Sequence, residues 1–392
     1  MSSTTTSTTT LLAASSVTVR AAESPASYKY ARFLPHYAEQ PKMAPLEPFE
    51  HVDIGKEALT DAEPRSFLKN AVVNEISPKF GLEVVEGVDL TTLDRRERAQ
   101  LALLVAQKGV VVFRNQNNFV DADPRWQIDD FGASFGRIHF HPATGPPKDY
   151  PEFHVVYYET DGHKVTDRNG GLYLGSLNRT SLHSDVSYEM QASHFFPGRV
   201  RSQADYLSSQ SKLTAPSALT CFRSMTCLFL YETPESGGDT LYIDTEEAYN
   251  RLSPSFAAYL ETLSAEHSGH QQAAVARSFR GEAGVRREPV ANIHPVIRRH
   301  PVTGKKSIYV NKGFTTRVVG LKAEESKAIL DLLFNHLAAG HDFMIRARWA
   351  KNTVVCWDNR RTGHSALLDF DENVKGMRHG ARITMQAERP SL

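Results

Sequence analysis

Two histidines and one aspartate are the residues with the clearest chemical use. His183 and Asp185 are separated by a single residue, and His364 follows far downstream. Two imidazoles and one carboxylate can hold Fe(II) on one face of an octahedron, which leaves the opposite positions open for a co-substrate and O2. A His-x-Asp triplet also arises by chance in a chain with 16 histidines and 45 acidic residues. The prediction of an oxygenase therefore depends on the surrounding residues.

The spacing predicts which elements present these ligands. Residues two apart in a β-strand point to the same face, so His183 and Asp185 can converge on one ion while Ser184 points away. Residues 352–363 begin as an apolar, β-prone run and break into a polar turn just before His364. A distant strand would bring His364 alongside, as at the mouth of a barrel. The alternative is that His183 is an ordinary hydrogen-bonded residue at a strand end.

Two arginines follow the last histidine and are four residues apart. They are Arg378 and Arg382. A guanidinium presents a rigid bidentate fork to a carboxylate, whereas a surface arginine normally stays solvated. The pair therefore indicates anion binding near the metal ligands, and the alternative is two exposed arginines near the C-terminus.

With these residues, the chain resembles the taurine dioxygenase family of Fe(II)- and 2-oxoglutarate-dependent oxygenases, most closely its fungal sulfonate dioxygenase branch. The resemblance runs in family order from about residue 75 to the end. It implies a mainly β domain with flanking helices (α+β), a cupin-like jelly roll or double-stranded β-helix with the metal at one open end. The matching segments are residues 108–114, 135–142, 182–188, 237–242, 300–305, 309–317, 357–360 and 378–384.

The resemblance also implies a role for each of nine residues, while iron carries the chemistry and no separate protein acid or base is assigned. The ligands of Fe(II) would be His183, Asp185 and His364. The co-substrate 2-oxoglutarate would contact Thr240 and Arg378, and the primary substrate would contact His141, Val186, Phe314 and Arg382. Thr240 and Phe314 are equally compatible with an ordinary turn hydroxyl and an ordinary core side chain.

Two departures from the family pattern concern the substrate pocket. The His141-Pro142 pair is followed by Ala143, where bacterial taurine enzymes carry a tyrosine, and Ala273 aligns with another aromatic pocket residue. The anion-binding residues are thus partly kept while the walls have changed. A sulfonate, a sulfate ester or a carboxylate could each satisfy Arg382 and His141.

Length and composition fit one enzyme domain with appendages. The 392 residues include 45 basic and 45 acidic side chains, a balance that creates no field to attract nucleic acid or an anionic membrane. No apolar run is long enough to span a bilayer. Three cysteines are too few for a disulfide framework, which predicts a reducing, cytoplasmic location. The expected partner is a small anionic substrate, and a homo-oligomer is compatible with the sequence.

The chain is expected to begin with a disordered, low-complexity tail (residues 1–25) and a proline-bearing arm (26–74). The dioxygenase domain would occupy residues 75–392, where a helical pattern over 92–108 leads into a strand over 109–113. An atypical insertion at about 192–219 separates two strands that family members keep closer. It is either a lid over the iron site or, as its weak periodicity favours, a surface loop or translated intron.

Three functions are compatible with these residues. The leading prediction is oxidation of an alkyl sulfonate or sulfate ester next to the heteroatom, which would give an aldehyde plus sulfite or sulfate, with succinate and CO2. The alternative applies the same chemistry to an amino acid or small carboxylate of fungal secondary metabolism, with hydroxylation or an oxidative cyclisation such as aziridine formation. The third is a non-catalytic binding protein on this fold, and the intact metal triad and both arginines argue against it.

Overall fold

The computed structural model describes residues 27–37, 41–47, 49–160, 165–167, 182–189, 222–367, 369 and 376–392. The chain divides into two units, Met1–Ala31 and Arg32–Leu392, and the helices and strands named here belong to the second. The predicted tail (1–25) and the predicted insertion (192–219) lie outside the described residues.

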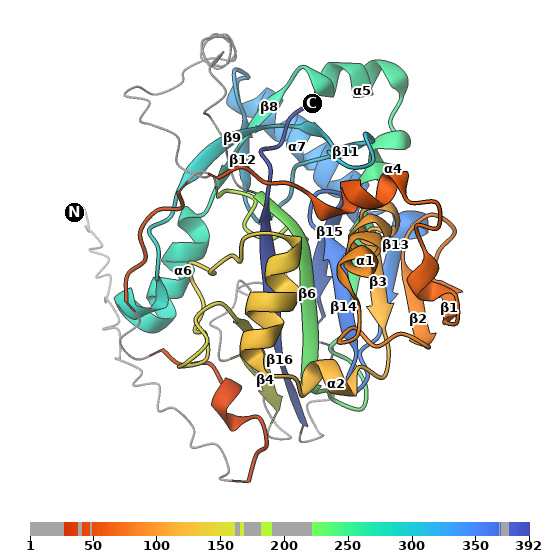
Figure 1. The fold of residues 1–392 in the computed structure, drawn as a ribbon. Helices are drawn as coiled ribbons and strands as arrows, with labels where there is room; N and C mark the ends of the chain where they lie inside the picture. The colour runs from red at the N-terminus through yellow and green to blue at the C-terminus, as the bar shows by residue number, and fades with distance from the viewer. Residues whose placement is uncertain are drawn as a thin grey trace, which may run out of the picture. The chain divides into compact units, whose positions relative to one another are not determined.

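An eight-stranded sheet forms the main layer, in the order β1-β2-β3-β14-β6-β16-β4-β5. The pair β2 and β3 is parallel and the other neighbouring pairs are antiparallel. Figure 1 shows the long strands β6 and β16 near the middle of this layer. The bounds are β1 Val72–Glu75, β2 Leu82–Glu86, β3 Val110–Phe113, β4 His154–Thr160, β5 Val165–Asp167, β6 Phe222–Glu232, β14 Val354–Asp358 and β16 Gly376–Ala387.

A three-stranded sheet, in the order β13-β7-β15, packs against the large sheet. Its strands are β7 Thr240–Asp244, β13 Met344–Ala347 and β15 Thr362–Ala366. One buried apolar cluster joins the two sheets, because Tyr242 and Ile345 of the small sheet meet Val112, Leu230 and Trp357 of the large one. β-Branched and aromatic residues suit such pleated, covered surfaces. The two sheets thus enclose a shared core.

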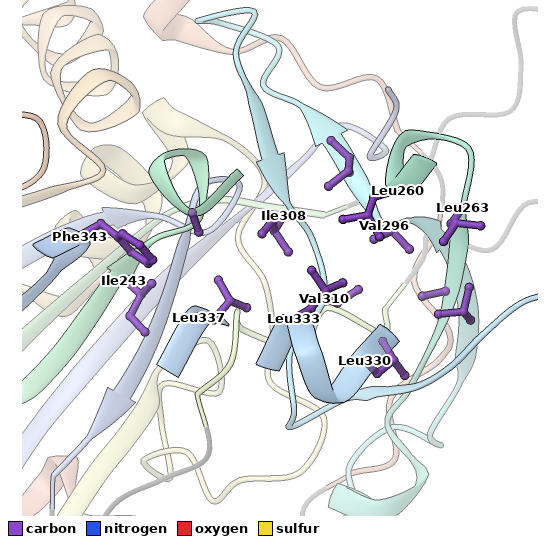
Figure 2. Close-up of a cluster of buried hydrophobic side chains, with 14 residues drawn as sticks. Ile243, Leu260, Leu263, Val296, Ile308, Val310, Leu330, Leu333, Leu337 and Phe343 are labelled. Atoms are coloured by element: carbon purple, nitrogen blue, oxygen red, sulfur yellow. The ribbon is translucent and has the colours of Figure 1, made fainter. Parts of the chain in front are cut away.

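A second core lies beneath the long helix α7 (Ala323–Ala338), as Figure 2 shows. Its residues Leu330, Leu333 and Leu337 recur at the spacing of one helix face and meet Ile308 and Val310. Around it lie the sheets β12-β8-β9 and β10-β11. Their bounds are β8 Ser264–Ser268, β9 Ala291–Pro295, β10 Ile297–Arg299, β11 Lys306–Ile308 and β12 Thr315–Val318.

The predicted helix and strand before residue 114 are confirmed with small shifts in their bounds. Helix α1 covers Arg95–Lys108, and Asp94 caps it by accepting a hydrogen bond from the backbone N–H of Glu97. The helix ends at Gly109, whose φ of 74° suits glycine, and a Cβ there would lie 2.4 Å from the Phe80 ring. The chain then enters β3 directly, so this glycine sets the close approach between helix and sheet.

Shorter helices complete the described fold. The α-helices are α2 Asn117–Val120, α4 Thr245–Asn250, α5 Pro254–Glu261 and α6 His270–Arg280. A π-helix spans Trp126–Phe131, and 3₁₀-helices include Ile54–Thr60, Ser66–Leu68, Gly132–Phe135, Gly281–Gly284 and His341–Phe343. Among the helices that the structure describes, none has the length and apolarity required of a membrane span.

Candidate functional site

The three predicted metal ligands lie together. The Oδ1 atom of Asp185 is 3.9 Å from Nε2 of His183 and 3.6 Å from Nε2 of His364, and ligand atoms of all three lie within 4.8 Å of one another. Ligand atoms about 2.1 Å from an ion sit roughly 3 Å apart on an octahedral face. The donor set and these separations therefore fit Fe(II) after a small closure of the side chains.

A β-bridge aligns the two histidines. The backbone N–H of His183 donates to the carbonyl oxygen of His364 at 3.0 Å, and the reverse bond measures 2.8 Å. His364 belongs to β15, which pairs with β7 in the small sheet. The imidazole rings consequently lie with their centroids 4.4 Å apart. As predicted, a distant strand brings His364 beside His183.

The predicted strand through Asp185 is wrong, because a turn places this residue instead. Only His183 takes part in the bridge, and residues 185–188 form a turn. Val186 in this turn has a φ of 35°, a conformation that a β-branched residue rarely adopts and that costs of order 1–3 kcal/mol. The surrounding contacts must therefore hold the turn in shape.

The buried hydroxyl groups of Ser184 and Ser187 hold the first part of this turn through hydrogen bonds. The Oγ of Ser184 donates to the carbonyl oxygen of Asn359 at 2.8 Å. Ser187 accepts from Nδ2 of Asn311 at 2.9 Å, so its own hydroxyl is free to donate to Nδ1 of His267 at 2.9 Å. Burial lowers the pKa of His267 to about 3, which keeps this imidazole neutral and able to accept.

A buried ion pair holds the end of the turn. Glu189 accepts from Nε of Arg287 at 3.1 Å and also contacts His139. Arg287 donates in addition to the carbonyl oxygen of Phe140 at 2.9 Å. This network therefore ties the Asp185 turn to the segment that carries His141, the predicted substrate residue.

A second buried network fixes the turn between β14 and β15, which precedes His364. Arg360 donates to Asp358 at 2.6 Å and to Asp53 at 2.5 Å, and His300 contacts Asp358 at 2.9 Å. Burial alone would raise the pKa of Asp358, but the charge of Arg360 and the His300 contact hold it well below its usual range. Ionised carboxylates thus anchor the turn between β14 and β15.

One cavity collects all nine predicted site residues. Its lining includes the metal ligands, the residues predicted for 2-oxoglutarate and those predicted for the primary substrate: His183, Asp185, His364, Thr240, Arg378, His141, Val186, Phe314 and Arg382. The structure thus brings together positions spread over more than half of the sequence.

Both arginines are buried, so the alternative of two exposed arginines is wrong. Arg378 donates through Nε to the carbonyl oxygen of Gly238 at 2.8 Å, and its guanidinium lies 5.5 Å from the Trp349 ring centroid. Arg382 donates through Nη1 to Oδ1 of Asp185 at 2.7 Å. A residue predicted to bind the substrate therefore also contacts a predicted metal ligand.

The hydroxyl group of Thr240 has a defined hydrogen-bond direction. Nε1 of Trp349 lies 3.1 Å from Oγ1 of Thr240. Because an indole nitrogen can only donate, Thr240 accepts this bond and keeps its own proton for an acceptor. Thr240 lines the cavity, so that proton is available to an anion there.

Sequence reasoning missed several lining residues. Strand β4 contributes His154, Val156 and Tyr158, whose spacing of two places them on one face. The sequence does not show which of the two alternating faces of this apolar run meets the cavity. Tyr242 of β7 also lines the cavity; its hydroxyl is buried and has no hydrogen-bond partner among the described residues.

The expectation for Ala273 needs correction. This residue is buried against Ala143, Ala276 and Val285 and is not among the residues that line the cavity. Helix α6 instead presents other side chains to it. They are Gln272, Val275 and Ala276. Helix α6 lies close to the segment that carries His141, because the side chains between them are mostly alanines.

Comparisons with known proteins agree with this geometry. A family model described as taurine catabolism dioxygenase TauD, TfdA family matches residues 73–196 and 216–384. Residues 197–215, which the match leaves out, fall inside the predicted insertion, and that insertion stays a prediction.

Individual relatives point the same way. The alpha-ketoglutarate-dependent sulfonate dioxygenase of Saccharomyces cerevisiae is 38% identical over 92% of this chain and 79% of its own length. The alpha-ketoglutarate-dependent dioxygenase cnsP of Penicillium expansum is 34% identical over 92% of this chain and 87% of its own. The crystal structure of a taurine dioxygenase from Burkholderia xenovorans is similar with a TM-score of 0.56 at 26% identity, covering 82% of this chain and 90% of that one.

Proposed function

Because this chain belongs to the taurine catabolism dioxygenase TauD, TfdA family, we propose that it oxidises an alkyl sulfonate or a sulfate ester at the carbon next to the heteroatom. It is a 2-oxoglutarate-dependent dioxygenase. Hydroxylation beside a C–S bond leaves an unstable product that collapses to an aldehyde and sulfite, while 2-oxoglutarate becomes succinate and CO2. With a sulfate ester, sulfate leaves instead.

The metal would be held by His183, Asp185 and His364. When bound, Fe(II) with 2-oxoglutarate and O2 supplies the oxidising chemistry. The protein residues fix the geometry: the bridge between the histidines and the strained turn at Val186 set the positions of the three ligands. Three protein ligands leave the remaining coordination positions to co-substrate and O2.

The distal carboxylate of 2-oxoglutarate would be bound by Arg378 and Thr240. Arg378 is buried and restrained by Gly238 and Trp349, so its charge is fixed in place before the anion arrives. Thr240 has a proton to donate because it already accepts from Trp349. A charge-assisted bond and a hydroxyl donor are a suitable pair for one carboxylate.

The anionic head of the primary substrate would lie between Arg382 and His141. Both side chains are buried and line the same cavity as the metal ligands. Val186 and Phe314 pack together beside them and would contact the carbon chain. An anion held at this end would leave a C–H bond directed toward the metal.

The convergence of all nine residues on one cavity carries this proposal. Its test is turnover by the purified protein with Fe(II), ascorbate and 2-oxoglutarate under air. Succinate and sulfite are measured with C2 to C6 alkane sulfonates, alkyl sulfates and α-amino acids. Succinate that rises with a sulfonate, together with equimolar sulfite, is the expected result. No substrate-dependent succinate with any sulfonate or sulfate ester would refute it.

The second candidate substrate is an amino acid or another small carboxylate. The observation in its favour is the altered wall, since Ala143 and Ala276 stand in the pocket where larger side chains would narrow it. The relative cnsP is described only as an alpha-ketoglutarate-dependent dioxygenase. Succinate formation without sulfite in the same panel would select this candidate.

We also assign the two facing sheets to a double-stranded β-helix, or jelly roll. The core shared by the β13-β7-β15 sheet and the eight-stranded sheet supports this assignment. So does the position of the candidate metal ligands at the edge where β15 meets His183. Cytoplasmic location, self-association and the absence of nucleic-acid binding stay predictions from the sequence.

A further inference from the structure

We infer that His154 is a third donor to the anionic head of the primary substrate, so that the site suits a group with three terminal oxygen atoms. Sulfonates and sulfate esters share that head, whereas a carboxylate has two oxygen atoms in one plane. The inference rests on the proposed function above and narrows its substrate class.

His154 is a neighbour of both residues proposed for the head. It lies directly opposite Arg382 in the antiparallel ladder of β4 and β16. Side chains of directly opposed residues share one face of a sheet, and both residues line the cavity. The His154 ring also lies 4.5 Å from the His141 ring, edge to face. The three nitrogen-bearing side chains therefore lie next to one another in the lining of the cavity.

A neighbouring hydrogen bond sets the donating form of His141, and a hydroxyl contact is compatible with the same form of His154. The backbone N–H of Ala143 donates to Nδ1 of His141 at 3.2 Å, so in the neutral ring Nε2 carries the proton. The Oγ1 of Thr144 lies 3.3 Å from Nδ1 of His154. If this hydroxyl donates in the same sense, Nε2 of His154 also carries a proton. Two adjacent residues, Ala143 and Thr144, would thus orient two imidazoles toward the head.

Arg382 supplies the third N–H donor. Its Nη1 is engaged by Asp185, while its Nε is buried without a hydrogen-bond partner among the described residues. A buried N–H donor of a charged side chain costs free energy when it has no acceptor. An anion bound next to Nε of Arg382 is therefore favoured. One donor each from Arg382, His141 and His154 matches the three oxygen atoms of a sulfonate.

Replacement of His154 should separate sulfonates from carboxylates. In His154→Leu we expect the KM for a sulfonate or alkyl sulfate to rise about tenfold, as for loss of one hydrogen bond to an anion. The KM for a carboxylate of the same chain length should rise less than about threefold, because two donors still suffice for it. The KM for 2-oxoglutarate should stay unchanged. His154→Gln, which keeps an N–H donor, should recover part of the loss.

Two further variants secure the test. Thr144→Val removes the orienting hydroxyl but keeps the shape, and it should raise the KM for the sulfonate selectively even if His154→Leu folds poorly. His270→Leu removes an exposed histidine on α6 and serves as the matched control. If His154→Leu and Thr144→Val raised the KM for the sulfonate and the carboxylate equally, or changed neither, the inference would be overturned. The proposed function would still stand in that case, provided that the wild type oxidises sulfonates. A wild type that oxidises carboxylates alone would overturn both.

Discussion

The guanidinium of Arg382 donates to the carboxylate of Asp185 across 2.7 Å. This contact joins a residue proposed for the substrate to a residue proposed for the metal. The charge of Arg382 stabilises the buried carboxylate, and the Arg382 side chain lines the cavity. Substrate binding and metal geometry should therefore respond to the same side chain, unlike the binding of 2-oxoglutarate, which we propose for Arg378.

Asp185→Ala should abolish tight Fe(II) binding. A facial triad has only three protein ligands, and even residues behind metal ligands change affinity 10- to 100-fold, so loss of this carboxylate should weaken Fe(II) by more than about 100-fold. Equilibrium dialysis with metal analysis measures this without turnover. Asp331→Ala, at an exposed ion pair on α7, is the control. If the Asp185→Ala variant bound Fe(II) with unchanged affinity, the assignment of Asp185 as a metal ligand would be wrong.

The two buried arginines should fail in different ways. Arg378→Ala removes the fixed cation for 2-oxoglutarate, a loss of about 2–5 kcal/mol that would raise its KM by roughly 30-fold or more. Arg382→Ala should chiefly raise the KM for the primary substrate. Steady-state kinetics with each substrate varied separates them, and exposed Arg348 offers an Arg348→Ala control. The same defect toward 2-oxoglutarate in both variants would contradict this division.

Acidification should destabilise the fold through buried neutral histidines. Burial lowers the pKa of His379 to about 4, and His379 contacts the carbonyl oxygen of Phe33 at 3.1 Å. Since the folded pKa lies below the unfolded value of about 6.5, the unfolded state binds more protons between these values. The free energy of unfolding should thus fall as the pH drops from about 6.5 to about 4, by up to roughly 1.4 kcal/mol per pH unit for each such histidine.

The variant His379→Gln keeps a donor for Phe33 and does not titrate. Urea unfolding at several pH values should therefore show a shallower pH dependence than the wild type. Exposed His270 provides the control His270→Gln, which should keep the wild-type slope. The carboxylate Asp358 acts at lower pH, because its depressed pKa preserves stability above about pH 4. Identical slopes in wild type and His379→Gln would show that this histidine titrates alike in both states.

The grouping of the candidate metal and anion residues in one cavity could be predicted from the sequence, because the chemistry proposed for them restricts the residue type. Two histidines, an aspartate and two arginines keep recognisable spacings wherever the fold brings them together. The turn at Asp185 could not be predicted, since Val186 gives no local signal of its positive φ. Long-range contacts to His267 and Arg287 impose that conformation instead.

The role of β4 was hidden for a different reason. Residues 153–158 are almost all apolar or aromatic, so no polar contrast marks which alternate positions face the cavity. Only the register with β16 shows that His154 lies opposite Arg382. Pairing between strands more than 200 residues apart is decided by the whole fold, and a single sequence does not display it.

Trp349→Phe should weaken 2-oxoglutarate binding although Trp349 does not line the cavity. The indole N–H occupies a lone pair of Thr240, so that the hydroxyl proton stays available to the co-substrate at its proposed site. Without this bond the hydroxyl can rotate, and a loss of about 1 kcal/mol would raise the KM for 2-oxoglutarate about fivefold with little change in kcat. Thr240→Val should give a larger rise and Thr240→Ser a smaller one. If Trp349→Phe still raised the KM in a Thr240→Val background, the tryptophan would act through its ring on Arg378 and not through the hydroxyl.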